Sequence, residues 1–301
     1  MELQRDVFIN VIYKAAQKDK DIVFLTADLG AKALDEFRQE LPGQCLHIGI
    51  SEQNMIDVAA GLSQMGKKVY CYAMAPFATL RCFEQIRVCL GAMKQPVTII
   101  GVGVGYGYDD AGPTHYATED LACMRTIAGM EIYTPCDNTT TGYIAEDSLI
   151  RPTLRYVRLD RKALPEVYSN PIGLSDGLFH AQGSKVLIMT SGFMVHTANK
   201  IQEKLGIGVL DIFRIKPLAI EALVEAVEQY EHLITLEEHF LAGGFGSAIL
   251  EVLNDVGINR PILRIGSRHH YYFENGGRNY IHELAGIDEK SVLNKVEGLI
   301  K

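Results

Sequence analysis

The feature of this sequence that most constrains its fold is an alternation of short apolar runs with segments of helical periodicity. Helices are predicted between the apolar runs, at 54–65, 81–93, 196–205, 220–231 and 246–256. The runs themselves predict strands at 22–27, 45–48, 68–72, 97–101, 131–134, 154–158, 186–190, 208–212, 233–237 and 262–265. Continuous apolar strands separated by helices are typical of parallel sheets that are covered on both faces. The sequence therefore predicts an α/β protein built from doubly wound, mainly parallel sheets.

The strand–helix pattern lapses once, at 161–184. Prolines, glycines and short polar runs replace it there, which is typical of a linker or a mobile edge. We therefore predict two α/β domains, comprising residues 1–168 and 169–301. The first 21 residues mix charged residues with an amphipathic pattern, and this predicts a helix rather than a signal peptide.

Composition excludes several classes of function. The formal net charge is −8 and no run of Lys or Arg stands out, so nothing favours nucleic acid or a membrane surface as partner. No apolar stretch reaches membrane-spanning length. The six cysteines form no C-x-x-C pair, and most lie in apolar surroundings. We interpret them as reduced core residues of a cytoplasmic protein.

Two segments of the first half contain candidate functional residues. In GISEQNM (49–55), Glu52 follows a predicted strand where a helix is about to begin. A carboxylate at that position either stabilises the start of the helix or is a reactive group. In YAMAPFATLRCFEQIR (72–87), Phe77, Leu80 and Phe83 recur at three-residue spacing. Such spacing places them on one helix face, which is ordinarily part of the core.

A third segment, GYDDAGPTHYATEDLACMR (107–125), presents a histidine. The turn residues of Gly112-Pro113-Thr114-His115 precede a predicted helix start. A histidine in a loop of this kind is a better ligand candidate than an isolated one.

Taken in this order, the three segments resemble the pyrimidine-binding domain of the transketolase family of thiamine-diphosphate enzymes. In the second half, IKPL (215–218), EEH (237–239) and GGFGSA (243–248) are similar to the C-terminal domain of that family. The resemblance covers nearly the whole chain. It implies a pyrimidine-binding thiamine-diphosphate fold followed by a transketolase C-terminal-like domain.

Full-length members bind magnesium and the diphosphate through a Gly-Asp-Gly segment, which this sequence does not contain. The resemblance therefore implies the C-terminal subunit of a split transketolase, whose N-terminal, diphosphate-binding subunit is another chain. Family members build each active site across a dimer interface, which implies an α2β2 heterotetramer. The expected cofactors are thiamine diphosphate and Mg²⁺, with the metal ligands supplied by the partner and none by this chain.

The implied reaction moves a two-carbon ketol unit between a ketose and an aldose that carry a phosphate or similar anion. Glu52 matches the family glutamate that holds a proton at the pyrimidine ring nitrogen. Phe77, and next Phe83, are the candidates to stack on the pyrimidine, because aromatic rings pack well on one another. Arg81 and Leu80 are further candidates to line the cofactor.

The resemblance also implies residues for the substrate. His115 matches a catalytic histidine that contacts substrate hydroxyls. Arg161 matches an arginine that binds the terminal phosphate, and Arg158 is a second candidate. A planar guanidinium suits this task because it binds anions through two hydrogen bonds. Without the resemblance, both arginines would be interpreted as surface charges after a strand.

Three departures from the family pattern leave the sugar open. Ala111 stands where members have an acidic residue that reads a sugar hydroxyl, and Tyr116 stands where a glutamine is usual. Either the loop has one extra residue and Asp110 substitutes, or the sugar lacks the usual hydroxyl pattern. The aromatic and basic loop RHHYYF (268–273) is expected to serve the partner interface or a non-standard substrate.

Two alternatives remain from the sequence. One is the β subunit of a 2-oxo acid dehydrogenase, which shares the two-domain layout. The other is a non-catalytic interaction subunit. The Gly-Pro-Thr-His turn and Arg161 favour transketolase over the first alternative. Intact Glu52, Phe77 and His115 argue against the second.

Overall fold

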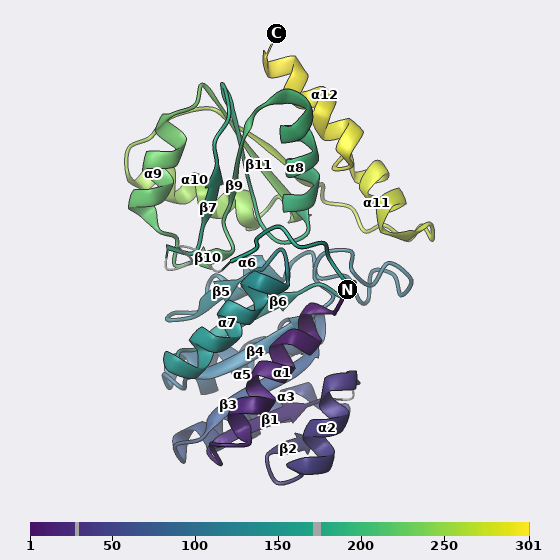
Figure 1. Cartoon of the computed structure of the whole chain (residues 1–301), viewed down its shortest axis with the longest axis vertical. Coiled ribbons are helices and arrows are strands. Elements are labelled where there is room, and N and C mark those ends of the chain that lie inside the picture. Colours follow the sequence, from purple (N-terminus) through teal and green to yellow (C-terminus); the bar gives the residue numbers. More distant parts are fainter. Residues whose placement is uncertain (28–29, 171–175, 301) are drawn as a thin grey trace.

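The computed structural model describes residues 1–27, 30–170 and 176–300. It contains two α/β domains stacked along the long axis of the molecule (Figure 1), one around a seven-stranded sheet and one around a five-stranded sheet. The two mainly parallel, helix-covered sheets confirm the predicted fold class. In the part of the chain that the structure describes, no helix is both long and apolar enough to cross a membrane.

The sheet of the first domain has the strand order β10-β5-β6-β4-β3-β1-β2. Every neighbouring pair is parallel except β10 with β5. The six strands from this half of the chain all correspond to predicted ones: β1 (Ile22–Thr26), β2 (Cys45–His47), β3 (Lys68–Met74), β4 (Val97–Val102), β5 (Glu131–Tyr133) and β6 (Arg155–Leu159).

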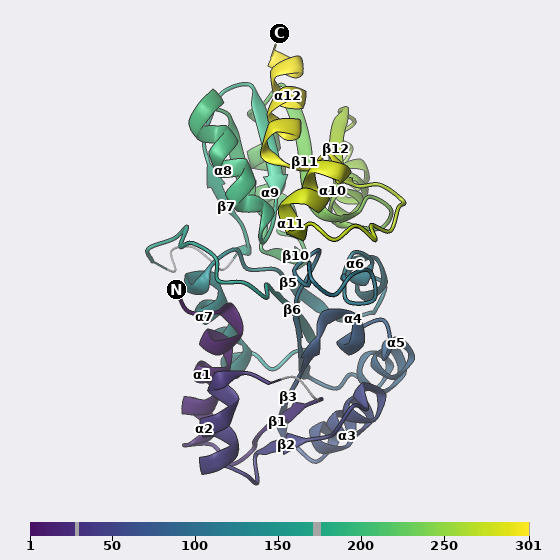
Figure 2. The ribbon, with the colours of Figure 1, turned by 90° about the vertical axis from the view of Figure 1, so that its right-hand side faces the viewer.

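Helices cover both faces of this sheet (Figure 2). One face is covered by α1 (Gln4–Ala16), α2 (Lys32–Glu40) and α7 (Asn138–Ile150). The other is covered by α3 (Glu52–Gln64), α4 (Ala75–Ala78), α5 (Phe83–Gln85), the π-helix η1 (Ile86–Ala92) and α6 (Asp120–Met124). Strand β1 shows why its sequence is continuously apolar. Phe24 packs toward the α1 face and Leu25 toward the α3 face, because successive side chains point to opposite sides.

The second sheet has the order β12-β11-β8-β9-β7, and only β7 is antiparallel to its neighbour. Its strands are β7 (Phe179–Ala181), β8 (Val186–Thr190), β9 (Gly208–Asp211), β11 (His232–Phe240) and β12 (Ile262–Ser267). Figure 1 shows helices on both sides of it. They are α8 (Met194–Leu205), α11 (Gly277–Ala285) and α12 (Glu289–Ile300) on one side, and α9 (Ile220–Glu228) and α10 (Phe245–Asp255) on the other.

The structure differs from the sequence prediction in several elements. The predicted helix at 81–93 is the short α5 followed by η1. Strands β7 and β10 were not predicted, because each has only three residues, too few to show a period. Strand β11 continues to Phe240, past the predicted end at 237, because its polar end is buried among hydrogen-bonding partners.

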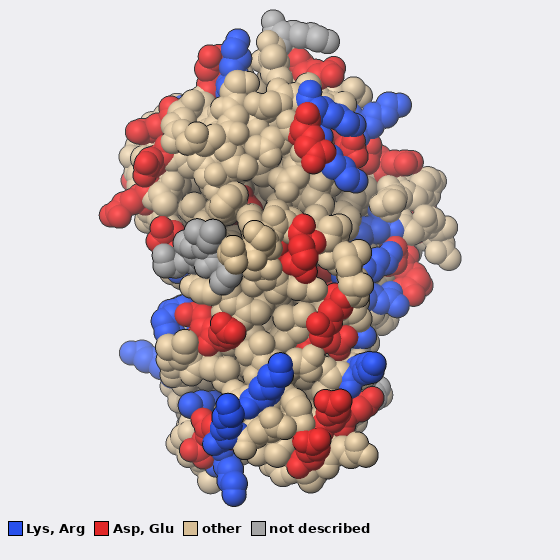
Figure 3. Space-filling model, viewed as in Figure 1, with Lys and Arg blue, Asp and Glu red and all other residues tan. Residues whose placement is uncertain are grey.

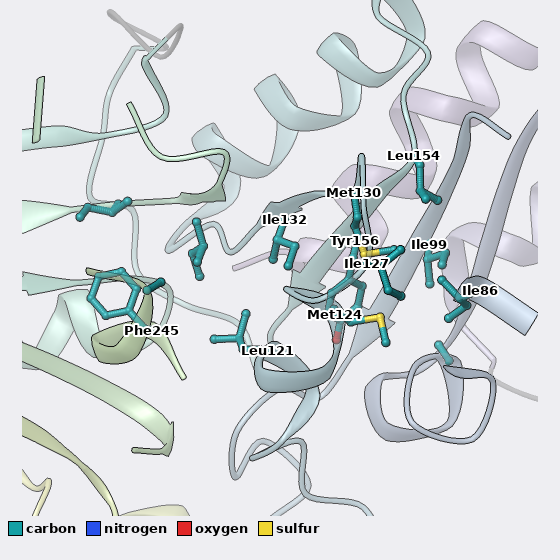
Figure 4. Packing of buried hydrophobic residues seen from close by; sticks show 14 of the residues in the cluster. Ile86, Ile99, Leu121, Met124, Ile127, Met130, Ile132, Leu154, Tyr156 and Phe245 are labelled. Carbon is teal, nitrogen blue, oxygen red and sulfur yellow. The ribbon is translucent and has the colours of Figure 1, made fainter. Parts of the chain in front are cut away.

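The two domains share both a sheet and a core. Strand β10 (Arg214–Lys216) follows β9 in the chain, yet it pairs antiparallel with β5 of the first domain. The Lys216 ammonium donates to the carbonyl oxygens of Arg125 and Ile127, at 2.7 and 2.6 Å. Figure 4 shows the common apolar core, which extends from Leu121 to Phe245 of the second domain. The predicted boundary at 168/169 remains a prediction. It lies in a connection with no α-helix or strand among its described residues, 160–170 and 176–178.

A buried ion network also joins the domains. Arg278, at the start of α11, is 3% exposed and donates to both carboxylate oxygens of Glu238 in β11. It also donates to Asp160, which follows β6, at 2.7 Å. His282 contacts Glu238 as well. Burial raises the pKa of Glu238, but the charges of Arg278 and His282 outweigh burial and lower this pKa to about 2.

Charged side chains are otherwise spread over the surface. On the face seen in Figure 3, Lys and Arg are interspersed with Asp and Glu, as the mixed charge of the sequence indicates. Many of these charges pair locally, as Arg87 does with Glu84 one helical turn away at 2.8 Å.

We predict that Arg278→Met lowers the free energy of unfolding by about 3–5 kcal/mol, because it leaves two buried carboxylates without their cation. Urea unfolding measures this change. Arg87→Met removes an exposed ion pair and serves as the matched control, with little or no effect expected. Equal losses in the two variants would show that the buried network does not stabilise the fold.

Candidate active site

The predicted site residues follow the carboxyl ends of parallel strands of the first sheet. Glu52 comes after β2, Phe77 lies in α4 directly after β3, His115 lies in the loop after β4, and Arg161 comes after β6. Strands β6, β4 and β3 are neighbours in the sheet, so these segments emerge at one edge. In α/β sheets that edge is where ligands bind.

Glu52 is the first residue of α3. Gly49 has a φ of +84° and allows the sharp turn between β2 and the helix. The Ser51 hydroxyl donates to the Ile48 carbonyl oxygen at 2.8 Å and fixes this turn. The Glu52 side chain is 4% exposed and lies in the first turn of the helix, where backbone N–H groups favour a carboxylate.

Arg81 connects Glu52 to Phe77. Its Nη1 donates to Glu52 Oε2 at 2.7 Å, and its Cζ lies 4.0 Å from the centroid of the Phe77 ring. A guanidinium over a ring face is a cation–π contact. The Arg81 side chain is 41% exposed, so it covers a buried carboxylate at the surface of the subunit.

The loop after β4 presents His115. Gly105 and Ala117 exchange two backbone hydrogen bonds, at 3.1 and 2.9 Å, and so close the base of the loop. A Cβ on Gly105 would lie 2.1 Å from Glu238 Oε2, so only glycine lets the loop meet the buried ion network. The centroids of the His115 and Phe77 rings are 5.2 Å apart, and Nδ1 of His115 is 2.9 Å from the Thr114 hydroxyl oxygen.

Arg161 pairs with Asp110 across the same loop. Nη1 of Arg161 donates to Oδ1 of Asp110, and Nη2 donates to Oδ2 at 3.1 Å. The hydrogen bonds from Arg161 lower the pKa of Asp110. The Arg161 guanidinium also lies over the ring of Tyr108, 4.5 Å from its centroid.

Tyr108 lies within this candidate site, although its sequence position did not single it out. Its ring is 5.8 Å from the His115 ring, so it links His115 to Arg161. Six predicted residues therefore form one row of contacts, with Tyr108 within it, in the order Glu52, Arg81, Phe77, His115, Tyr108, Arg161 and Asp110. The signal in the sequence was an aromatic residue inside the glycine-containing loop that ends in Gly-Pro-Thr-His.

Two predicted residues have other surroundings. Phe83 packs against the apolar core that Figure 4 shows in part. Arg158 is 5% exposed, and its Nε and Nη2 donate to the buried Asp120 at 2.7 and 3.0 Å. These contacts favour a structural role for Arg158, because its guanidinium already has a buried anionic partner.

The row fits one end of thiamine diphosphate. A planar aminopyrimidine needs an aromatic face and a carboxyl group at the ring nitrogen, and Phe77 and Glu52 offer both. The other end of the cofactor is an anionic diphosphate with its metal, which takes hard oxygen ligands. Within residues 1–27, 30–170 and 176–300, no three or more His, Cys, Asp or Glu side chains are grouped to hold a metal ion.

Comparison with known protein families agrees with this geometry. Residues 4–166 match the model of the transketolase pyrimidine-binding domain, and residues 176–292 match that of the transketolase C-terminal domain. The chain belongs to the transketolase family, whose members depend on thiamine diphosphate.

Two relatives of similar length are named as transketolase subunits. One subunit of the apulose-4-phosphate transketolase of Phocaeicola vulgatus is 33% identical over 99% of this chain and 97% of its own length. The 6-deoxy-6-sulfo-D-fructose transketolase subunit SqwH of a Clostridium species is 32% identical over 96% of this chain and 92% of its own length. The chain thus has the two-domain organisation of a split-transketolase C-terminal subunit, as predicted.

Solved structures agree as well. A split-gene transketolase, described as an inactive β4 tetramer, superposes with a TM-score of 0.85 at 30% identity over 98% of this chain and 97% of that one. A transketolase of Pichia stipitis has the same fold, with a TM-score of 0.78 at 18% identity, and this chain covers 45% of it.

We predict that Phe83→Ala and Phe77→Ala have different consequences. Phe83→Ala should lower the free energy of unfolding by about 2 kcal/mol, because Phe83 packs on the core and a fully buried Phe costs about 3–5 kcal/mol. Phe77→Ala should cost clearly less, because the Phe77 ring contacts Arg81 and His115 whereas Phe83 packs on the apolar core. Urea unfolding of both variants provides the comparison, and a larger loss for Phe77→Ala would contradict it.

Proposed function

We propose that this chain is the pyrimidine-binding subunit of a thiamine-diphosphate-dependent transketolase that moves a two-carbon ketol unit between sugars with an anionic tail. The observation that carries the proposal is the row of contacts from Glu52 to Arg161. The row joins a buried carboxyl group, an aromatic ring, a histidine and a guanidinium along one sheet edge. The chain that carries it is a member of the transketolase family.

The first part of the row is proposed to bind the cofactor, which when bound supplies the electron sink for breaking and forming the carbon–carbon bond. Glu52 holds a proton at the pyrimidine ring nitrogen from a site that excludes water. Phe77 stacks on the ring, and contact between rings of this kind adds about 0.5–1.5 kcal/mol beyond area burial. Arg81 lines the same place, and it occupies only Oε2 of Glu52 among the hydrogen bonds described.

The rest of the row is proposed to bind the sugar. His115 contacts the Phe77 ring, which is proposed to stack on the cofactor. His115 would therefore lie close to the reacting carbons and face the hydroxyls next to them. Arg161 would bind the distal anion through its planar fork. The names of two relatives support an anionic tail, since one refers to a 4-phosphate and the other to a 6-sulfo sugar.

The active assembly is proposed to be an α2β2 heterotetramer. Several relatives are named as subunits, and the related β4 tetramer is described as inactive, which supports both self-association and the need for a partner. The partner would supply the ligands of Mg²⁺ and the diphosphate. The six free thiols of the described chain support a reducing, cytoplasmic location.

We predict that Glu52→Gln folds normally but loses turnover by at least about 10²-fold in the assembled enzyme, because an amide cannot take part in general acid–base chemistry. Exchange of the hydrogen on the cofactor's reactive carbon for deuterium measures this step directly. The exposed Glu84→Gln is the control. Exchange at the wild-type rate in Glu52→Gln would remove Glu52 from cofactor activation.

We also predict that this chain alone is inactive and binds thiamine diphosphate weakly, because the described residues offer a place for the pyrimidine but no metal-binding cluster for the diphosphate. Calorimetry with Mg²⁺ and cofactor is the measurement. Adding a partner subunit with Gly-Asp-Gly should produce cofactor binding, magnesium dependence and ketol transfer together. Micromolar binding or ketol transfer by the chain alone would contradict the split-enzyme proposal.

A further inference from the structure

The guanidinium of Arg161 is already engaged by a carboxylate of its own chain. Its two terminal nitrogens donate to the two oxygens of Asp110, in the paired geometry that a phosphate or sulfonate would also use. Asp110 therefore occupies the position on Arg161 that is proposed for the anionic tail of the substrate.

Asp110 and its neighbour Asp109 are held in different ways. The Asp109 side chain is 11% exposed, pairs with Lys162, and accepts the backbone N–H of Arg278 at 2.8 Å. The Asp110 side chain is 65% exposed, and Arg161 is its one side-chain partner among the interactions of the described residues. Exposed ion pairs of this kind contribute little to stability. Asp109 is thus anchored to the second domain, whereas Asp110 is attached through one replaceable pair.

The cation, in contrast, has a second support. The Tyr108 ring lies under the Arg161 guanidinium and is itself 8% exposed. The same ring contacts His115. Loss of Asp110 would therefore leave Arg161 in place over the Tyr108 ring, free to bind another anion.

We infer that Asp110 determines specificity for the sugar by exchanging its partner, from Arg161 to the substrate. It neutralises Arg161 in the empty site, gives way to the anionic tail of the sugar, and then accepts hydrogen bonds from sugar hydroxyls beside His115. This inference rests on the proposed function, in which Arg161 binds the distal anion. A simple anion must displace Asp110 and gains nothing from the released carboxylate. A sugar that has both an anion and hydroxyls within reach also displaces Asp110, but its hydroxyls then donate hydrogen bonds to the released carboxylate. These bonds offset the loss of the Arg161–Asp110 pair.

Two ligands separate this exchange from simpler roles of Asp110. The first is inorganic phosphate, whose binding to the purified chain is followed by ³¹P NMR. Asp110→Asn should bind it about two- to fivefold more tightly, because the competing carboxylate is gone. Asp109→Asn is the matched control, since it removes the same charge one residue away, and its affinity should change clearly less. Arg161→Ala should abolish the gain when combined with Asp110→Asn.

The second ligand is the anion-tailed sugar, tested with the assembled enzyme. Here Asp110→Asn should lower kcat/KM by about tenfold, because a hydrogen bond to a charged acceptor is lost. Asp110→Asn is therefore expected to strengthen the binding of phosphate and to lower kcat/KM for the sugar.

Weaker or unchanged phosphate binding by Asp110→Asn would overturn the exchange, because Asp110 would then orient Arg161 rather than compete for it. A higher kcat/KM for the sugar would overturn the role of the released carboxylate. The proposed function is tested separately. Ketol transfer by the wild-type assembly would uphold it whatever the phosphate titration shows.

Discussion

The contact on which the rest of the structure depends is the burial of Arg278 between Glu238 and Asp160. One guanidinium satisfies carboxylates from two domains, and the backbone N–H of the same residue donates to Asp109 in the loop after β4. Burying three charges is costly unless each has a partner of opposite sign, so none of the three can leave without exposing the others to that cost. The network therefore fixes the second domain against the loop that carries His115.

This arrangement explains why a site made from the first domain needs the second. Asp160 precedes Arg161 and Asp109 precedes Asp110, so the anchored residue of each pair belongs to the network and the neighbouring residue faces the site. Gly105 completes the contact, because a side chain there would collide with Glu238. The motif EEH (237–239), which resembles the family's C-terminal domain, has its physical basis in this region. Glu237 caps the start of α10 through the backbone N–H groups of Phe245 and Gly246, at 2.6 and 3.0 Å.

Much of this could be predicted from the sequence, and the failures have identifiable causes. The apolar strands of the first sheet were found because both faces are buried, as in β1, where all five residues are buried. Strand β10 was missed because its partner strand belongs to the other domain. It has only three residues, the first and last of them charged, so it shows no hydrophobic period. The end of β11 was missed because its carboxylates are buried by ion pairs, which hydropathy cannot detect.

The site shows the same division. Glu52 and His115 could be proposed because each belongs to a segment with a recognisable turn or helix start, and Phe77 because its segment resembles that of the family. Phe83 has the same spacing as Phe77 but faces the core, since helical spacing does not reveal which side a short, irregular helix presents. Arg158 and Arg161 are three residues apart, yet one is inside the strand and pairs with Asp120 while the other is beyond its end. Only the position of the strand end separates them.

The shared sheet also bears on how such a chain can be divided. Without β10, the edge of β5 would present unpaired backbone groups, and an open edge of that kind is a template for aggregation. Separation of the two domains at the connection after β6 would open this edge and also expose the apolar surface between Leu121 and Phe245. The connection looks like a linker, yet it is a poor place for a gene to be broken. Pyrimidine-binding and C-terminal domains of this form are therefore expected to be inherited as one polypeptide.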